Sequence, residues 1–527
     1  MELTNIVELV NRRWAEKVQV RLNAQRALCE LVSESSVLVE LCGWLAAELD
    51  YSFAGLIVEE QRLEWELRYV FYRDRDAGWV YVLVHQALAN VTFPSISARM
   101  HAADWHEREA EDLFGLIFEG HPRLGDFVLH DDRWQENLEP MRHGFDGHKP
   151  VVHREPDLDW RPRRIVKEPG AFAMPIGPIY SGVTESVHFL LETVGEDVIR
   201  TIPRLFYKYR AIEKLAEGRS VEEALLLAER FAATTAFAHA LAFCQAAESI
   251  CGVEVPARAK VMRVLLAELE RFRHHAGAIQ EICESTALVV ANNQAAMLEE
   301  ELLRLSCAFT GHRYLFGLAV CGGLARPFED TACREVVEQA RGILQRLDEL
   351  ETMLNVSSSF LDRLEEVGIV SEQEARNHGL VGPVGRASGL ARDLREAQPY
   401  SGYDAFSFDV PCERKGDGYA RLRVLFAEAR QSVRLMEQAA AALPGGPIQV
   451  PKVEIRGGAA LGWAEAPRGA TFHWLRVDED NRVARYRLIT PSFTNWHGLH
   501  LAAEEFAFQD FPIILASFDL SVAENDR

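Results

Sequence analysis

The sequence predicts an α/β N-terminal domain followed by a mainly α-helical domain with small β elements at its start and near its end. Three features predict this α+β arrangement. Aromatic and β-branched residues cluster in two early runs, a Pro-, His- and Arg-rich stretch without apolar period follows, and long helical periodicity comes after it. We therefore expect a first domain over residues 1–147, an extended linker over 148–172 and a second domain over 173–527.

The expected elements follow in chain order. The two early runs, residues 65–72 and 79–88, have the composition of strands. Helices are expected from Pro256, a favoured first-turn residue, to about Cys283, and then over residues 299–316 and 330–354. The tail over residues 457–487 alternates like a hairpin, with a turn at Asp480 and Asn481.

The helix expected after Pro256 has two different faces. Its apolar stripe includes Val261, Leu265 and Phe272. Glu268, Arg271 and His275 recur at steps of three and four on another face, so they can contact one another. Such a polar face is more often solvated than functional, and solvation is the expectation from this helix alone.

Composition narrows the range of partners. The 527 residues include 48% hydrophobic residues, enough for a large core, and the formal net charge is −22. This charge repels nucleic acid and anionic lipids, so a basic partner protein is expected instead. No leader follows Met1, and the most apolar window, residues 224–247, contains Glu229, Arg230 and His239. We expect a cytoplasmic chain that reaches a membrane only through partners.

The nine cysteines are scattered and form no CxxC pair. Zinc ribbons, ferredoxin-type clusters and thioredoxin chemistry therefore lose support. Isolated cysteines in a cytosolic chain are usually reduced and behave as small buried hydrophobes. We expect this for all nine.

The first chemically unusual stretch is HEREAEDLFG, from His106 to Gly115, followed by Gly120, His121, Pro122 and later by Pro140 and Arg142. By itself it could be a charged helix start leading into a turn. It also resembles the signature of the 30-kDa-type subunit of complex I, in which ERE, DLFG, GHP and a late P-x-R occur in the same order. Walker, GxGxxG, GxSxG and HExxH motifs are absent from the sequence.

A second resemblance covers most of the remaining chain. It is to the 49-kDa-type subunit of complex I and to the large subunit of the membrane-bound group 4 nickel–iron hydrogenases, the formate hydrogenlyase and hydrogenase-4 type. The matching segments are residues 176–178, 195–196, 209–217, 256–275, 310–323, 382–400, 465–469, 491–493 and 517–527. The chain thus resembles a fusion of two complex I subunits, and a hydrogenase-large-subunit-like fold is implied for the second domain.

The nickel ligands of the hydrogenases can be checked residue by residue. Four thiolates from two CxxC pairs bind nickel there, and two of them bridge to iron. In the family's first segment, ERxCGxCGFAH, this chain has Ala232 and Thr235 at the cysteines; in the terminal DPCxxC segment it has Ser521 and Glu524. Alanine cannot bind a metal and neutral hydroxyls are poor ligands for a soft centre, so a nickel–iron site and hydrogenase activity are not expected in this chain.

Complex I uses the corresponding cavity for quinone, with a tyrosine and a loop histidine as donors to the headgroup. Those positions correspond here to Ala233 and Thr184, so neither donor is kept. Glu185 resembles the glutamate with which hydrogenases pass protons, although a loop carboxylate is usually on the surface. Tyr180 and His239 are the remaining candidate donors beside it.

Three further expectations rest on the resemblance. Arg230 matches an arginine near the partner's iron–sulfur cluster, with a surface ion pair to Glu229 or Glu222 as the alternative. Glu213, Glu268 and His275 are candidates for a proton path, with structural ion pairing as the alternative. No cofactor is expected to be bound by this chain itself; a 4Fe–4S cluster is expected in the partner small subunit.

Two functions remain open at this point. In the first, the chain is a peripheral-arm subunit of a membrane-bound, energy-converting oxidoreductase complex of the NADH:quinone or hydrogenase type. It would dock on an iron–sulfur small subunit and on antiporter-like membrane subunits, and couple redox chemistry to ion translocation. In the second, it is itself the catalytic subunit, reducing quinone or another acceptor with Tyr180, Thr184, His239 or Glu185 as donors. A free-standing soluble protein would require the ordered matches to be accidental.

Overall fold

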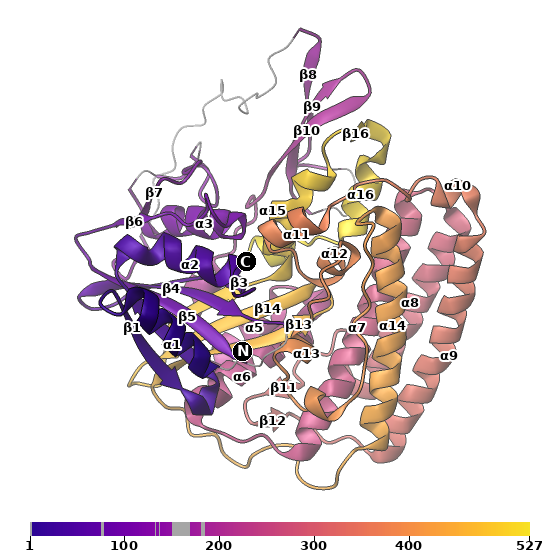
Figure 1. Cartoon of the computed structure of the whole chain (residues 1–527). Coiled ribbons are helices and arrows are strands. Elements are labelled where there is room, and N and C mark those ends of the chain that lie inside the picture. The colour runs from indigo at the N-terminus through magenta and orange to yellow at the C-terminus, as the bar shows by residue number, and fades with distance from the viewer. Residues whose placement is uncertain (1–2, 75–77, 132, 136, 150–168, 181–184) are drawn as a thin grey trace.

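The N-terminal part of the chain is built around a five-stranded sheet (Figure 1). In this computed structural model residues 3–74, 78–131, 133–135, 137–149, 169–180 and 185–527 are described. The strand order is β1-β2-β5-β4-β3, with β2 and β5 parallel and the other pairs antiparallel. The strands are β1 Val18–Asn23, β2 Leu28–Ser33, β3 Ser52–Glu60, β4 Glu64–Tyr72 and β5 Trp79–Ala87. Both predicted strands are confirmed as β4 and β5.

This sheet is buried on both faces, as alternate residues of β5 show. Val80 and Val82 belong to the core that also contains helices α1 (Leu3–Trp14), α2 (Leu38–Ala47) and α3 (Asp104–Phe114). Tyr81 and Leu83 belong to a second core, shared with strands from the end of the chain. Because a strand directs successive side chains to opposite faces, the sheet joins the two cores.

The C-terminal strands lie across the second face of that sheet. They are β13 Gly458–Ala466, β14 Gly469–Val477 and β15 Val483–Ile489, all antiparallel, and Asn481 takes a left-handed conformation in the predicted turn. Helix α6 (Ala236–Cys251) packs on β13. A Cβ at Gly462 would lie 2.0 Å from the Ala242 carbonyl oxygen, so this close approach requires glycine.

Four long helices form a bundle on the other side of these strands (Figure 1). They are α7 Ala257–Ser285, α8 Val289–Thr310, α9 Asp330–Asn355 and α14 Gly418–Ala441. The predictions for α7 and α9 are confirmed. The prediction for α8 was ten residues late at its start, and α14 was not predicted although its apolar residues recur at helical spacing.

The polar face of α7 is not solvated, which corrects the expectation from its periodicity. Glu268, Arg271 and His275 are all buried, because α14 packs along this face and presents polar groups of its own. Exposed Cys307 and Cys412 likewise contradict the expectation that all nine cysteines are buried. Cys321 is partly exposed, and the other six are buried.

A narrow sheet projects from the body of the molecule (Figure 1). It contains β8 Ala171–Ile176, β9 His188–Val194, β10 Asp197–Arg204 and β16 Phe506–Ala507. Most of the predicted linker, residues 150–168, lies outside the described residues, so the domain limits stay predictions. Along the described part of the chain, no helix is long and apolar enough to cross a membrane.

Short elements complete the structure and carry the chain end into the interior. The short strands are β6 Thr92–Pro94, β7 Ile117–Glu119, β11 Ala319–Val320 and β12 Gly323–Leu324. The short helices are α4 Ile212–Ala216, α5 Val221–Arg230, α10 Ser358–Leu361, α11 Glu372–His378, α12 Gly382–Ala387, α13 Leu394–Ala397, α15 Pro491–Ala502, α16 Phe511–Phe518 and α17 Val522–Asn525. The terminal Arg527 is only 1% exposed.

Candidate functional site

The four positions that replace the hydrogenase cysteines lie on two segments that meet inside the molecule. Ala232 and Thr235 precede α6, whereas Ser521 and Glu524 begin the terminal helix α17. Thr235 Oγ1 donates to Glu524 Oε1 at 2.7 Å, and Ser521 Oγ accepts from the Glu524 backbone N–H at 3.2 Å. We call these four residues the four-position site. All four are at most 7% exposed.

Arg468, in the turn between β13 and β14, neutralises this site. Its guanidinium lies 3.3 Å from Glu524 Oε1 and 3.1 Å from Asp519 Oδ1. Ser492 Oγ donates to the other oxygen of Glu524 at 2.5 Å. Burial alone would raise the pKa of Glu524, but the positive charge of Arg468 and these hydrogen bonds hold it well below its usual range. Glu524 is therefore ionised and fully hydrogen-bonded by the protein.

The four-position site does not fit a nickel–iron centre. Ala232 has no donor atom, and the Thr235 hydroxyl and both Glu524 oxygens are already engaged. The Ser521 oxygen caps α17. Within the described residues, no group of three or more His, Cys, Asp or Glu side chains has the geometry to hold a metal ion.

His239 on α6 continues the site into a buried chain of polar groups. Its Nε2 lies 3.8 Å from Glu524 Oε1, and its Nδ1 lies 3.1 Å from His473 Nε2. His473 Nδ1 is 2.8 Å from the Tyr486 hydroxyl. Since a carboxylate only accepts, the consistent arrangement has Tyr486 donating to His473, His473 to His239, and the His239 Nε2–H directed at Glu524. We call Glu524, His239, His473 and Tyr486 the histidine relay.

The other predicted catalytic residues are separate from this relay. The Tyr180 hydroxyl donates to the Val187 carbonyl at 2.8 Å, and burial raises its pKa. Glu185 is exposed, and its carboxylate accepts from the backbone N–H groups of Val522 and Ala523 at 2.6 and 2.9 Å. Glu185 thus anchors the segment that carries Ser521 and Glu524. Thr184 lies outside the described residues, and the catalytic roles stay predictions.

Arg230 ends α5, two residues before Ala232. Its Nε lies 3.3 Å from Glu229 Oε1, and its guanidinium lies over the Phe316 ring at 5.6 Å. The Arg230 side chain is nevertheless 57% exposed, whereas that of Glu229 is 3% exposed. The ion pair with Glu229, which was the alternative for Arg230, is therefore present, and the guanidinium remains accessible two residues before Ala232; the position facing the partner's cluster stays a prediction.

Glu268 and His275 belong to one buried charge network under α14. Glu268 accepts from Arg395 at 2.9 Å, from the Tyr403 hydroxyl at 2.6 Å and from Ser432 at 2.7 Å. His275 Nε2 lies 2.9 Å from Glu428 Oε2. Burial lowers the pKa of His275, despite the opposing effect of Glu428. The α7 network comprises Glu268, Arg271, His275, Arg386, Asp393, Arg395, Glu428 and Glu465.

The α7 network contains four carboxylates and three guanidiniums, so one carboxylate has no cation of its own. The raised pKa of Glu465 indicates that Glu465 is this carboxylate. Burial, followed by the nearby charge of Asp393, raises the pKa of Glu465 to about 7, although Arg386 opposes the shift. A proton on Glu465 would neutralise the network.

Glu213 belongs to a different cluster, at the junction between the N-terminal sheet and the C-terminal strands. It pairs with Arg487 at 3.1 Å and with Arg527 at 3.5 Å, and Glu109 accepts from both guanidiniums at 2.5 and 2.8 Å. These four residues form the junction cluster. Glu109 lies in the HEREAEDLFG segment, so part of that signature binds the two halves together.

Sequence reasoning missed several residues that complete these sites. His473 and Tyr486 of the relay lie on strands that the alternation of apolar and polar residues predicted. That alternation does not show that these two residues contact each other or His239. Glu428 lies on the unpredicted α14. Arg468 lies in segment 465–469, which the resemblance covers. The replacement of the thiolates was the sequence signal that could have pointed to it.

Comparison with protein families gives two matches. Residues 31–151 match the family described as respiratory-chain NADH dehydrogenase, 30 Kd subunit. Residues 293–457 and 450–527 match the family described as respiratory-chain NADH dehydrogenase, 49 Kd subunit. The two matches follow in the order expected of a fused chain.

Individual relatives extend the match through the middle of the chain. Formate hydrogenlyase subunit 5 from Escherichia coli is 31% identical over 85% of this chain and 79% of its own. Hydrogenase-4 component G from the same organism is 29% identical over 85% of this chain and 78% of its own. The C/D subunit of NADH-quinone oxidoreductase from Methylococcus capsulatus is 26% identical over 99% of this chain and 98% of its own.

Proposed function

Because the chain belongs to the family of fused C/D subunits of NADH-quinone oxidoreductase, related to subunits of formate hydrogenlyase and hydrogenase-4, we propose that it couples redox chemistry to ion translocation in a complex I-like assembly. It would act in the peripheral arm on the inner face of the membrane. Its partners would be an iron–sulfur small subunit, which holds the 4Fe–4S cluster, and antiporter-like membrane subunits. It would do this without a nickel site of its own.

The observation that carries this proposal is the internal pairing of the four-position site. Thr235, Ser492 and Arg468 satisfy the Glu524 carboxylate, so the positions of the lost thiolates are used within the protein. The histidine relay begins at this same carboxylate. A site of this kind favours proton movement over metal chemistry, because imidazoles such as those of His239 and His473 can both give and take a proton.

The buried charges supply a means of coupling. A change of charge at the partner's cluster would alter the proton affinity of nearby buried groups, since charges interact strongly where water is excluded. Arg230 offers an accessible cation next to the four-position site for that partner. The α7 network, with Glu268 and His275, and the junction cluster, with Glu213, would take up or pass the resulting protons.

The first test uses the purified complex. His239→Gln should leave the subunits assembled but lower proton translocation per electron severalfold, because glutamine interrupts the relay. His85→Gln, at a surface pair with Glu64, serves as the matched control and should change nothing. Stoichiometric nickel in the complex, or full coupling in His239→Gln, would contradict the proposal.

The second function, direct reduction of quinone or another acceptor in the cavity, is favoured by one observation. His239 Nε2 is buried and has no hydrogen-bond partner at normal distance, so it could donate to a carbonyl oxygen. In the complex, cluster-to-quinone electron transfer should then fall when Tyr180→Phe, Thr184→Ala and His239→Ala are combined. Undiminished transfer in this triple variant would exclude the role.

A further inference from the structure

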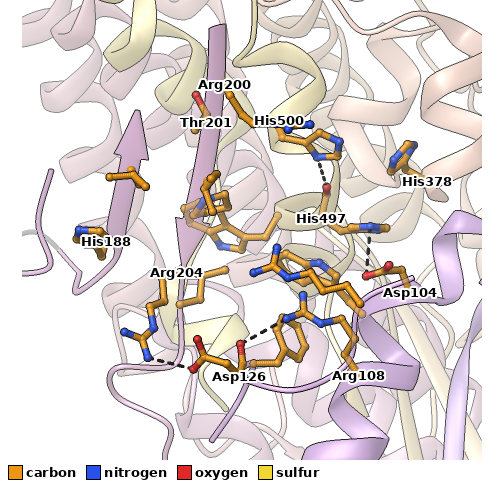
Figure 2. Close-up of a pocket in the computed structure, with 18 of the residues that line it drawn as sticks. Asp104, Arg108, Asp126, His188, Arg200, Thr201, Arg204, His378, His497 and His500 are labelled. Atoms are coloured by element: carbon orange, nitrogen blue, oxygen red, sulfur yellow. Dashed lines mark hydrogen bonds and ion pairs between the residues drawn. The ribbon is translucent and has the colours of Figure 1, made fainter. Parts of the chain in front are cut away.

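A pocket of about 720 Å³ lies between the N-terminal sheet domain, the projecting sheet and the C-terminal helices (Figure 2). None of the four-position residues lines it, although Trp496 of its lining donates through Nε1 to the Ser521 carbonyl at 3.3 Å. Four guanidiniums line it, although the whole chain carries a net charge of −22. They come from α3 (Arg108), from the loop after β7 (Arg123) and from β10 (Arg200 and Arg204).

Three carboxylates line the same pocket, and two of them are taken by two of the arginines. Arg204 lies 3.1 Å from Asp126 Oδ1, and Arg200 lies 3.6 Å from Glu504 Oε1. The third, Asp104, lies 3.9 Å from the Nε2 of His497. Across the described residues, neither Arg108 nor Arg123 forms an ion pair with a carboxylate. The four guanidiniums of the pocket therefore exceed its three carboxylates by one positive charge, and Arg108 and Arg123 are the two that no carboxylate of the pocket pairs with.

Arg108 is the more informative of these two cations. It is 5% exposed, and its Nε has no hydrogen-bond partner. Its guanidinium packs on the Phe127 ring at 4.2 Å and donates to the carbonyl oxygens of Gly125 and Asp126. Burial, with repulsion from Arg123, lowers its pKa to about 10, so it remains a cation at neutral pH. The carboxylates of Asp104, Asp112 and Glu111 oppose this lowering of the pKa only in part, so a bound anion would further stabilise the buried cation.

The opposite wall is made of imidazoles from three elements. His378 of α11 lies 5.0 Å from His497 and 5.5 Å from His500 of α15, and it stacks on His101 at 5.4 Å between ring centroids. His188 of β9 also lines the pocket. Burial lowers the pKa of His378 to about 4 and that of His497 well below its usual value, so these two rings are uncharged at neutral pH.

The hydrogen bonds of two histidines determine how they can meet a ligand. His378 Nδ1 donates to the Glu374 carbonyl at 3.0 Å, and His500 Nδ1 donates to the His497 carbonyl at 2.9 Å. In the neutral rings Nε2 is then only an acceptor, and it becomes a donor once the ring takes a second proton. An anion can therefore bind these histidines only together with protons.

We propose that this pocket binds a small soluble anion carrying two or more phosphate groups, held by Arg108 and Arg123 and by histidines that take up protons on binding. Guanidiniums bind phosphate oxygens through paired hydrogen bonds, and the volume exceeds the needs of a single phosphate. Trp105, Phe127 and Trp496 add an apolar wall for the rest of such a molecule. The proposed anion site does not depend on the proposed role of the chain in coupling.

Calorimetry on the full chain tests this, with pyrophosphate as the probe. Binding should be one to one and about tenfold tighter at pH 6 than at pH 8, with proton uptake visible as a buffer-dependent heat. Arg123→Gln should weaken it about tenfold without affecting the fold, because Arg123 is exposed. His378→Gln should reduce the pH dependence, because the lowered pKa of His378 leaves it a proton to gain on binding. Arg334→Gln, at an exposed site on α9, is the control.

Three results would overturn the proposal. They are an absence of pyrophosphate binding at pH 6, binding unchanged by Arg123→Gln, and binding whose strength does not depend on pH. Citrate tests the chemical class, since equal affinity for citrate would refute phosphate recognition. Inorganic phosphate should bind more weakly than pyrophosphate, and equal affinity would refute the requirement for two groups.

Discussion

Neutralising Glu524 should lower the stability of the terminal helix α17, and the contacts of Glu524 determine the size of this loss. Glu524→Gln keeps the size of the side chain but removes its charge, and Arg468 keeps its second partner, Asp519. The cost should therefore match one charge-assisted buried hydrogen bond, about 2 kcal/mol. Arg468→Met instead leaves both carboxylates buried without their cation, and it should cost about 4 kcal/mol.

Hydrogen exchange of the peptide that contains α17 measures these costs locally. A loss of about 2 kcal/mol corresponds to exchange about thirtyfold faster, and about 4 kcal/mol corresponds to about a thousandfold. Glu300→Gln, which removes an exposed carboxylate paired with Arg313 on the surface, is the control and should leave exchange in α17 unchanged.

The pH dependence provides a second check on the same prediction. The pKa of Glu524 is lowered in the folded chain, so its contribution is present above the ordinary carboxyl pKa of 4.5 and is lost as the pH falls below it. The difference between wild type and Glu524→Gln should therefore shrink in acid. Equal exchange in the two proteins at pH 7 would refute the view that Glu524 is ionised and paired.

Two further predictions concern the α7 network and the junction cluster. The raised pKa of Glu465 means that its proton stabilises the fold below pH 4.5, and this contribution, up to about 3 kcal/mol, is lost as the pH rises to about 7. Glu465→Gln should therefore flatten the fall in melting temperature between pH 5 and pH 8. An unchanged slope would contradict the count of four carboxylates against three guanidiniums. Arg527→Met should lower the melting temperature and speed exchange in both α3 and α17, because Arg527 joins Glu109 to the chain end. Arg12→Met, at an exposed position of α1, should do neither, and exchange faster in α17 alone would argue against a shared junction.

The sequence predicted best where one apolar period decides the structure. Strands β4 and β5 and helices α7 and α9 each have such a period, and they were placed to within a few residues. The α7 polar face was misread for a physical reason. Glu268 and His275 look solvated on their own helix, and partners from elsewhere in the chain make their burial favourable. These are Glu428 and Ser432 on α14, with Arg395 and Tyr403.

The candidate site was predictable in its positions but not in its contacts. The resemblance placed Ala232, Thr235, Ser521 and Glu524 at the former ligands, and the fold connects Thr235 and Ser521 to Glu524. The partners Arg468, Ser492 and His473 come from segments far away in sequence, so a linear motif could not pair them. Pairing of buried charges depends on distances that only the folded chain sets.

The replacements at the four-position site also explain why the surrounding framework can persist without thiolates. Four thiolates gather negative charge that a metal must balance, whereas here Glu524 is the one carboxylate among the four and Arg468 lies beside it. Arg468 is held in turn by Asp519, and Asp519 is 2.6 Å from His274 on α7. The charge of the four-position site is thus balanced by side chains that link the terminal helix to α7. A perturbation at Glu524 therefore has a continuous polar route both to the relay and to the long helices, as a role in coupling requires.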